Sequence, residues 1–568
     1  DIPQVNVDQA QYVVTAGEND ALITAHPPAK GAPVLRTAFD MPAKPVKKAR
    51  LYATARGIYD FYINGKRVSD DYYNPGLTQY NKTHLYQTYD VTPFLQNGKN
   101  AIGAVLGEGW WSGLLSFGNT WNAFGDRQSL LAQLVITYED GSEHIVTTNE
   151  RDWQYSQQGP VRYGSLQMGE VYDARLEDDF ARWHSADYDT SNWHAAVVVP
   201  LDGSVSKNVR PNMARESQSL DYSQMQLIGQ IGETAGVYTT LTAQSVKEVK
   251  PGVYIYDMGQ NMVGVPSLHF PEGKAGQTVT LRVGEMLYPN LPESGPNVGM
   301  LMTENYRAAL SQDIYIMKDG EQHYSPRFTS HGYQYLEISG LDKPLPLESV
   351  QGLVTSSVQS LTASYACSDD TVNQLWSNLV WSNVDNFLWV PTDCPQRNER
   401  MGWSGDINVF GRTATYVSNA SPFLRRHLQA MRDTQSTDGR YADIAPVGGG
   451  FGGILWGSAG ITLPWENYLQ YGDTSMLEEH YNSMQRYMTY LEETINPVTG
   501  LIMDAGLGDW LGPQNFQLGS AYLASAYYIF TLDIMSEVAT VLGHDEDAAF
   551  YAQSANTRRE HFANTFVN

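Results

Sequence analysis

The chain of 568 residues is 42% hydrophobic, 12% aromatic and 17% charged, which is typical of a globular protein and excludes an intrinsically disordered one. Its formal net charge of −25 argues against binding to nucleic acid or to an anionic membrane surface, because both attract clustered lysine and arginine. The length predicts three or four domains, with ample material for several cores.

The cysteine and hydropathy patterns leave the compartment open. Cys367 and Cys394 are too few for a disulfide framework; a single bridge between them stays open, and two free thiols are our prediction. No apolar run approaches the ~18 residues that a membrane-spanning helix needs. The chain opens at Asp1 without a charged-then-apolar leader, so any signal peptide has been removed or never existed. We favour a periplasmic or secreted bacterial protein over a cytoplasmic one.

The first half of the chain is predicted to be β-rich. Residues 1–30 show no sustained period and are expected to form an N-terminal extension that packs on a neighbour. From 31 to 205, short alternating runs are punctuated by Asn64-Gly65 and Asp140-Gly141, which are hairpin turn signals. Many short strands at this spacing predict a jelly-roll β-sandwich.

A second β-sandwich is predicted from 206 to 362. The strings at 252–265 and 279–287 alternate between apolar and polar residues, as half-buried strands do. His331 and Glu285 lie within this block. We interpret both as strand residues that form hydrogen bonds at a domain interface rather than as catalytic groups.

From 363 onward the apolar period changes from two to 3.6, which predicts helices. Ser368, Asp369 and Asp370 are cap candidates for the first helix. Repeated helix pairs with loops at one end fit an (α/α)6 toroid. About seven helices are found where a complete toroid needs twelve, so the toroid is expected to be incomplete at the C-terminus: either the natural protein continues beyond Asn568, or this is a shorter relative. The further predicted helices lie around 405–416, 421–434, 460–471, 474–493, 518–541 and 545–563.

The stretch with the most chemistry runs from Thr392 to Asp406 and reads T-D-C-P-Q-R-N-E-R-M-G-W-S-G-D. Its prolines keep the first half out of a helix, so a loop is expected to lead into a helix that begins near Ser404. Carboxyl groups, guanidinium groups and an indole that converge on one loop suit a polar, uncharged ring such as a sugar. A salt-bridged structural loop is the alternative.

The string D-C-P-Q-R-x-E-R-x-G-W-x-G-D closely resembles the signature of the bacterial α-L-rhamnosidases, the inverting glycoside hydrolases of family 78. The blocks Y-I-N-G-K-R-V, G-E-G-W-W and G-E-V-Y-D-A-R resemble the N-terminal jelly-roll module of the same enzymes, and the second β block resembles the sandwich that precedes their catalytic domain. The resemblance runs from about Leu35 to the end of the chain. It implies an exo-acting, inverting hydrolase that releases terminal α-L-rhamnose from polysaccharides or glycosides, with an (α/α)6 catalytic domain at 363–568.

The resemblance also implies roles for individual residues. Glu399 is expected to be the general acid, and Asp393, Arg397 and Asp406 to bind rhamnose hydroxyls. Trp403 corresponds to a pocket aromatic. Two structural alternatives stay open, namely a salt bridge between Asp393 and Arg397 and an N-cap role for Asp406.

Further candidate residues lie on other loops. Trp456 and Trp510 match family tryptophans that line the pocket, although tryptophans there can also plug the end of a barrel; a wall of this kind suits the C6 methyl group of rhamnose. Asp509 is a further candidate contact to the substrate. Trp110 and Trp111 are a candidate secondary sugar site, with packing at a sandwich edge or lining the catalytic pocket from the side as alternatives. In some relatives such a module holds calcium, but no oxygen cluster with calcium-loop spacing is found here.

The sequence departs from the family pattern in two places and lacks one expected group. Ser458 follows Gly457 where the family commonly has Asp, and Asn398 stands where it often has Asp. The general base of the family is a glutamate in a later hairpin, and no segment up to Asn568 matches it, so the base is unknown and expected beyond Asn568.

Two other functions stay open for this reason: a rhamnose-binding protein that lacks a base, or a related (α/α)6 glycosidase for another 6-deoxy or uronic-acid-linked sugar. We expect no cofactor and find no zinc spacing, phosphate loop or nucleophile elbow. A structural calcium ion is the only metal the resemblance leaves open.

Overall fold

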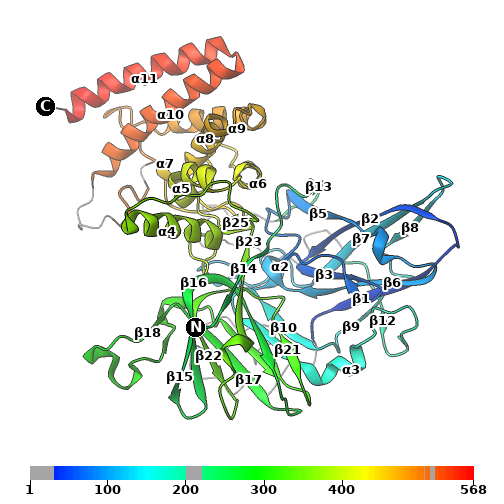
Figure 1. Ribbon diagram of the computed structural model, residues 1–568. Helices are drawn as coiled ribbons and strands as arrows, with labels where there is room; N and C mark the ends of the chain where they lie inside the picture. The colour runs from blue at the N-terminus through cyan, green and yellow to red at the C-terminus, as the bar shows by residue number, and fades with distance from the viewer. Residues whose placement is uncertain (1–30, 200–219, 505, 512–517, 568) are drawn as a thin grey trace.

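The computed structural model describes residues 31–199, 220–504, 506–511 and 518–567. Two β-rich parts are followed by a helical part, which lies at the upper left of Figure 1. The predicted extension at 1–30 and the predicted boundary between 205 and 206 lie outside the described residues. No helix in the described ranges has the length and apolar character needed to cross a membrane.

The first β-rich part is a sandwich of two sheets. One sheet has the order β12-β9-β1-β6-β3-β4, with β1 (Val34–Met41), β3 (Ile58–Ile63), β4 (Lys66–Arg67), β6 (Gly98–Gly107), β9 (Gln154–Ser156) and β12 (His194–Ala195). The other has the order β13-β5-β2-β7-β8, with β2 (Val46–Arg56), β5 (Thr83–Asp90), β7 (Ser129–Tyr138), β8 (Glu143–Thr147) and β13 (Gln226–Gly229).

The strands of this sandwich alternate between buried and exposed residues, as the sequence predicts. In β2, Ala49, Leu51 and Ala53 are buried while the residues between them are exposed, so one face of the strand packs inward. The predicted hairpin turn at Asn64-Gly65 joins β3 to β4, and both residues have positive φ, 48° and 88°. A two-residue turn of this kind matches the right-handed twist of the flanking strands.

The second β-rich part is a ten-stranded sheet of order β10-β11-β20-β17-β22-β16-β23-β14, with β15 and β21 also paired to β16. Its strands are β10 (Val161–Ser165), β11 (Gly169–Asp173), β14 (Gly236–Thr242), β15 (Ser245–Lys250), β16 (Val253–Phe270), β17 (Thr278–Gly284), β20 (Gln312–Ile316), β21 (Gln322–Tyr324), β22 (His331–Ser339) and β23 (Val350–Ser356). A small ribbon of β18 (Met286–Leu287) and β19 (Leu301–Met302) and the short helices α2 (Gly109–Ser112) and α3 (Glu177–Phe180) complete the β-rich half.

The two β-rich parts exchange strands, which the predicted division at 205 does not anticipate. β10 and β11 precede that division but join the ten-stranded sheet, where β11 pairs with β20 in parallel. β13 follows it but pairs with β5 of the first sandwich. Sheet membership depends on pairing partners far away in sequence, and the local alternation from which the division was drawn does not reveal them.

The helical part begins with one helix, and a short hairpin of β24 (Phe387–Leu388) and β25 (Val390–Pro391) separates that helix from the others. Asp369 caps that first helix, since its carboxylate accepts the amide hydrogens of Thr371 and Val372. This confirms the predicted cap. The helices are α4 (Asp370–Asn386), α5 (Ser404–Val417), α6 (Ser421–Asp433), α7 (Ile454–Gly457), α8 (Ala459–Tyr471), α9 (Ser475–Glu493), α10 (Ser520–Leu542) and α11 (Asp545–Phe566).

Both ends of the helical part leave apolar side chains in solvent. Leu375 on α4 is 56% exposed and Phe550 on α11 is 62% exposed. Figure 1 shows α4 and α11 on opposite sides of the helical part. Exposed apolar helix faces of this kind are typical of surfaces that pack against further structure.

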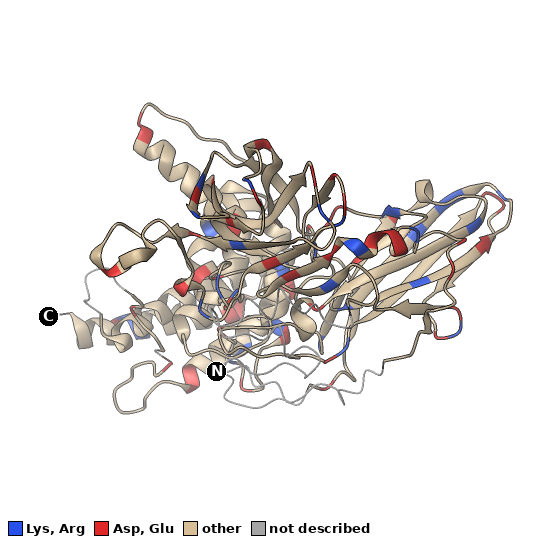
Figure 2. Cartoon of the chain, turned by 90° about the horizontal axis from the view of Figure 1, so that it is seen from below, with Lys and Arg blue, Asp and Glu red and all other residues tan. Residues whose placement is uncertain are grey.

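A shared core joins the three parts. One cluster of buried apolar side chains combines residues of the first sandwich, such as Trp111, with Val263 of β16 and with Met401 and Trp403 of the helical part. Figure 2 shows that acidic and basic residues are interspersed over the described part of the chain. His331 of β22 is fully buried, with its Nε2 2.9 Å from Asp313 Oδ2 of β20, and Glu285, between β17 and β18, accepts hydrogen bonds from Asn261 and Asn305. All of these partners lie within the second β-rich part, so the prediction that the two residues form hydrogen bonds at a domain interface is not confirmed by these contacts.

The buried titratable groups predict a fall in stability above neutral pH. Burial raises the pKa of Glu108, Glu170 and Asp385 to about 8. The folded protein therefore keeps protons that the unfolded chain loses near pH 4, and the free energy of unfolding falls as the pH rises toward 8. Burial lowers the pKa of His84 to about 4 and of His427 to about 3, which has the opposite effect, but only below about pH 6.5. We expect a lower urea midpoint at pH 8 than at pH 6.5.

The variant Asp385→Asn tests whether this buried carboxyl group contributes to the pH dependence of stability. Its amide oxygen can still accept the hydrogen bond that Val263 N–H donates to Asp385 Oδ1 over 3.0 Å, but the side chain no longer titrates. The difference between the two midpoints should shrink in this variant. Equal midpoints for the wild type at both pH values would contradict the prediction.

Candidate active site

The candidate site is built on the loop between β25 and α5. The loop closes like a hairpin, because the backbone N–H of Asp393 donates to Met401 O over 3.1 Å and Met401 N–H donates to Asp393 Oδ1 over 2.9 Å. Trp403 precedes the first helical residue, Ser404, where the prolines and the apolar period predicted a helix start. The side chains from Cys394 to Arg400 are thereby presented as one compact turn.

Glu399 lies at the centre of this turn and is only 8% exposed. Its Oε1 accepts the indole N–H of Trp403 over 3.0 Å. Its Oε2 lies 2.8 Å from Arg397 Nη2 and 3.3 Å from Arg307 Nη1. Three donors therefore fix both oxygens of one carboxyl group, an arrangement that orients it far more narrowly than a surface ion pair would.

Arg307 belongs to the second β-rich part. It follows the short 3-10 helix at Glu304–Tyr306 and has a positive φ of 57°. Tyr306 beside it is fully buried, and its hydroxyl donates to Gly332 O. This anchoring directs Arg307 toward a carboxyl group 92 positions further along the chain.

Arg397 forms its ion pair with Glu399. Among the ion pairs of the described residues there is none between Arg397 and Asp393, so the predicted alternative of a mutual salt bridge is wrong. Asp393 instead holds the turn closed through Met401 N–H.

Two further carboxyl groups stand beside Glu399. Burial and the nearby charge of Glu399 raise the pKa of Asp393 to about 7. Partial desolvation, and to a smaller extent Glu399, also raises the pKa of Asp406. Asp406 is the third residue of α5 and its residue surface is exposed; the N-cap position belongs to Trp403, so the N-cap alternative for Asp406 is wrong. With a pKa of about 7, the Asp393 carboxyl group is therefore partly protonated at neutral pH.

Trp403 and Trp456 are packed side chains. The Trp403 ring stacks on Phe117 at 6.4 Å and meets Phe451 edge-on at 5.7 Å. Trp456 is 9% exposed and packs against two glycines, Gly405 and Gly452. A Cβ at Gly405 would lie 2.4 Å from the Nε1 atom of Trp456. Only the absence of a side chain at these positions lets the ring reach the first turn of α5.

Asp509 and Trp510 lie on the segment before α10. Trp510 is 53% exposed, and Asp509 Oδ2 accepts the N–H of Leu518 over 3.1 Å. The same segment passes Trp456, because Leu507 N–H donates to Gly452 O over 3.2 Å and a Cβ at Gly452 would lie 2.3 Å from the Trp456 ring. Among the described contacts, none joins Asp509 or Trp510 directly to Glu399.

Asp443 ties two loops to the start of α5. Its backbone oxygen accepts Ser404 N–H over 2.7 Å, and its Oδ2 contacts Arg440 Nη2 at 2.9 Å and Gly452 N at 2.8 Å. Burial raises the pKa of Asp443 to about 6. Its other oxygen has no hydrogen-bond partner among the described residues.

The cysteines and the carboxyl cluster do not favour a metal ion. Both cysteines are free thiols, as predicted. Ligand atoms of Asp393, Cys394 and Glu399 lie within 4.8 Å of one another. However, burial and the charge of Asp393 raise the pKa of the Cys394 thiol, and two guanidinium groups already occupy Glu399. A cation would have to displace both arginines and bind a protonated thiol.

The prediction of a secondary sugar site at Trp110 and Trp111 is wrong. Trp110 is 6% exposed and Trp111 is 3% exposed, and both lie in the core that joins the three parts. Tyr80 and Phe124 pack against Trp111. A sugar ring cannot stack on indole faces that other aromatic rings already cover.

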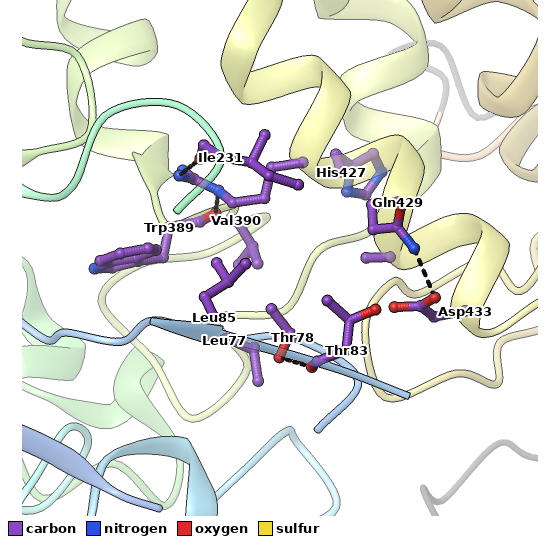
Figure 3. Close-up of a pocket in the computed structure, with 12 residues that line it drawn as sticks. Leu77, Thr78, Thr83, Leu85, Ile231, Trp389, Val390, His427, Gln429 and Asp433 are labelled. Atoms are coloured by element: carbon purple, nitrogen blue, oxygen red, sulfur yellow. Dashed lines mark hydrogen bonds between the residues drawn. The ribbon is translucent and has the colours of Figure 1, made fainter. Parts of the chain in front are cut away.

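A small internal cavity lies between the first sandwich and α6 (Figure 3). Its volume of about 10 Å³ suits about one water molecule and no sugar. Gln429 and Asp433 are hydrogen-bonded at its edge over 2.8 Å, and neither ring nitrogen of His427 has a partner in the described part of the chain. The cavity is a packing gap at a domain junction, with a mainly apolar lining.

The comparisons with known proteins cover most of the chain. Three family models match: the six-hairpin glycosidase domain of bacterial α-L-rhamnosidases at 360–568, the α-L-rhamnosidase N-terminal domain at 44–217 and the bacterial α-L-rhamnosidase concanavalin-like domain at 247–356. The chain belongs to the bacterial α-L-rhamnosidase family. The order of the three domains is the order of the two β-rich parts and the helical part described above.

Individual relatives support the same family assignment. An α-L-rhamnosidase from Streptomyces avermitilis is 38% identical over 546 residues, 95% of this chain and 49% of that protein. One from Formosa agariphila is 33% identical over 548 residues, 94% of this chain and 55% of that protein. The crystal structure of the Streptomyces avermitilis enzyme complexed with L-rhamnose superimposes with a TM-score of 0.85 at 37% identity, over 95% of this chain and 49% of that one. This chain thus spans about half the length of the curated relatives it matches.

Sequence reasoning missed the contribution of the N-terminal sandwich to this rhamnosidase-family site. Phe117 stacks on Trp403, and Asn398 Nδ2 donates to Asn119 Oδ1 over 2.7 Å. Asn398 is 2% exposed. It is one of the two positions where the sequence departs from the family pattern, and this departure was the available signal, because a buried amide at that position needs a hydrogen-bond acceptor.

Asn398→Asp tests this contact between domains. The carboxylate loses the N–H that donates to Asn119 and Phe117, and it faces two oxygens instead. We expect docking of the loop around Asn119 to weaken by about 1–2 kcal/mol. Hydrogen exchange at 115–120 should rise several-fold, while exchange in α8 stays unchanged.

The matched control is Asn149→Asp on an exposed turn of the same sandwich. Its side chain makes only local contacts. Unchanged exchange at 115–120 in Asn398→Asp would show that this hydrogen bond does not hold the loop.

Proposed function

We propose that the chain is the acid-bearing, sugar-binding portion of an exo-acting, inverting α-L-rhamnosidase that removes terminal α-L-rhamnosyl groups from polysaccharides or glycosides. The observation that carries the proposal is Glu399, a buried carboxyl whose two oxygens are fixed by Trp403, Arg397 and Arg307. The relatives are named α-L-rhamnosidases, and a solved relative is complexed with L-rhamnose.

In the proposed reaction, Glu399 donates a proton to the glycosidic oxygen as the bond between that oxygen and C1 of rhamnose breaks. A water molecule attacks C1 from the opposite face and gives its proton to a second carboxylate, so the product is β-L-rhamnose. The two carboxyl groups of inverting enzymes lie ~6.5–9.5 Å apart to leave room for that water.

The donors around Glu399 set a condition for this role. A carboxylic O–H on Oε2 cannot point at two guanidinium groups, which are donors themselves. We propose that the hydroxyl groups of the bound sugar take over Arg397 and Arg307, which frees Oε2 to carry the proton. Substrate binding would thereby prepare the acid.

The remaining site residues are proposed to bind the sugar. Asp393 and Asp406 stand beside Glu399 and offer oxygens to the rhamnose hydroxyls. Trp403 and Trp456 would offer ring edges, and exposed Trp510, with Asp509 beside it, would form an apolar wall for the C6 methyl group. A methyl contact of this kind discriminates by only ~1–3 kcal/mol.

The general base is proposed to lie beyond Asn568. The relatives are about twice as long, and the exposed apolar residues Leu375 on α4 and Phe550 on α11 offer surfaces for further helix pairs. Acid–base hydrolysis by two carboxyl groups needs no cofactor, and we propose none. Export to the periplasm or the medium would place the enzyme where it meets such glycosides.

Proton NMR of an aryl α-L-rhamnoside with the protein tests the function. Early appearance of β-L-rhamnose would support the inverting rhamnosidase. Early α-L-rhamnose would rule out inversion. An intact rhamnoside with L-rhamnose bound would favour a binding protein without a base, and cleavage of a different aryl 6-deoxyglycoside or uronide instead would favour another glycosidase.

A further inference from the structure

A cluster of two histidines and one glutamate lies on the ten-stranded sheet, on strands that contribute none of the residues around Glu399. The register of β16 against β21 places His269 directly opposite His323. Their rings stack with centroids 4.5 Å apart and planes 18° apart. Glu321 Oε1 lies 2.8 Å from His269 Nε2.

The backbone under this cluster is held rigidly. Leu268 and Phe270, which flank His269, are 1% and 0% exposed, and Tyr324 beside His323 is 4% exposed. Because side chains alternate along a strand, the buried neighbours force both histidines onto the opposite face. His269 is about one third exposed, so the cluster is open to solvent.

The turn before Glu321 is fixed as well. Gln322 is buried, and its side-chain amide donates to Lys318 O over 2.9 Å and to Gly320 O over 2.8 Å. Its amide oxygen accepts the hydroxyl of Tyr315 over 2.9 Å. The three side chains of the cluster therefore approach one another from a preformed frame, which lowers the entropy that a ligand must overcome.

We propose that His269, Glu321 and His323 bind a divalent transition-metal ion, with Zn²⁺ as the best match. Their ligand atoms already lie within 4.8 Å of one another. Ligand atoms around a tetrahedral zinc ion lie roughly 3.3 Å apart, given bonds of about 2.0–2.2 Å, so small side-chain rotations suffice. Two imidazoles and one carboxylate leave the fourth position to water.

The metal would join β16 to β21 and stabilise this edge of the sheet. The two histidines lie far apart in sequence and have no zinc-ligand spacing along the chain; the strand register brings them together. A binding site that exists in the folded protein alone adds stability by mass action.

Titration calorimetry with Zn²⁺ on the chelator-treated protein tests the proposal. We expect one site in the wild type, at least 10-fold weaker binding in His323→Ala and in Glu321→Gln, and unchanged binding in His194→Ala, which removes an exposed histidine of the first sandwich. The thermal midpoint should rise with Zn²⁺ in the wild type and not in His323→Ala.

Electron paramagnetic resonance with Cu²⁺ identifies the ligands directly. Nitrogen couplings from two imidazoles in the wild type, and from one in His323→Ala, would support the site. Zn²⁺ binding of equal strength in the wild type and His323→Ala would overturn it, because the ion would then reside elsewhere, and absence of binding in the wild type would overturn it as well.

Discussion

Glu399→Gln is expected to lower kcat/KM for a rhamnoside with a poor leaving group by about 10²–10⁴-fold. The amide cannot supply the proton that the departing oxygen needs. It can still accept the Trp403 N–H that Oε1 accepts over 3.0 Å, although its NH2 group cannot accept from Arg397 and Arg307. The hydrogen bonds between Asp393 and Met401 close the turn independently, so the turn should keep its shape. Affinity for L-rhamnose, measured by calorimetry, should change far less than the rate.

The choice of leaving group distinguishes a general-acid role of Glu399 from any other role of this residue. A 2,4-dinitrophenyl rhamnoside has a leaving group that departs without protonation, so Glu399→Gln should hydrolyse it at close to the wild-type rate. Glu293→Gln, on an exposed turn of the second β-rich part, is the control and should behave as wild type on both substrates. Equal losses on both substrates would mean that Glu399 acts as something other than an acid.

Local features of the fold could be read from the sequence because local interactions decide them. The predicted helices at 421–434 and 474–493 correspond to α6 and α9 within one residue at each end. The cap at Asp369 and the turn at Asn64-Gly65 depend on residues within a few positions. Apolar period, caps and turn residues are therefore sufficient for these elements.

The candidate site could be predicted only in part, because its partners come from other domains. The motif brought out Glu399, Arg397 and Trp403, which lie within seven consecutive positions. Arg307 and Asn119 lack such a signal, since Arg307 is 92 positions from Glu399 and Asn119 is 279 positions from Asn398. The error at Trp111 has the same origin: its burial depends on a core shared by three domains.

Arg400 shows how this convergence is held together. Its guanidinium is one of the two in the stretch from Thr392 to Asp406; it is 7% exposed and donates to four backbone oxygens. Leu166, in the turn between β10 and β11, and Ser330, just before β22, both belong to the second β-rich part, whereas Gln396 and Arg397 belong to the turn that carries Glu399. No ion pair of Arg400 is found among the described residues, and burial lowers the pKa of Arg400 to about 10.

Arg400→Met is therefore expected to lower the free energy of unfolding by about 3 kcal/mol. Each buried carbonyl that loses its donor costs about 1–3 kcal/mol, and removal of an unpaired buried charge offsets part of the sum. Methionine fills a similar volume, so the loss reflects hydrogen bonds rather than a cavity. Because Arg400 follows Glu399 directly, the carboxyl group should also lose its fixed orientation, and kcat should fall with stability.

Urea unfolding of three variants separates these causes. Arg400→Lys keeps the charge but has three donors at a single point instead of a planar fork, so it should lie between Arg400→Met and the wild type. Arg50→Met replaces an exposed arginine of β2 and should leave the midpoint unchanged. A midpoint for Arg400→Met equal to that of the wild type would show that packing of the shared core, and not the Arg400 fork, holds the second β-rich part against the turn that carries Glu399.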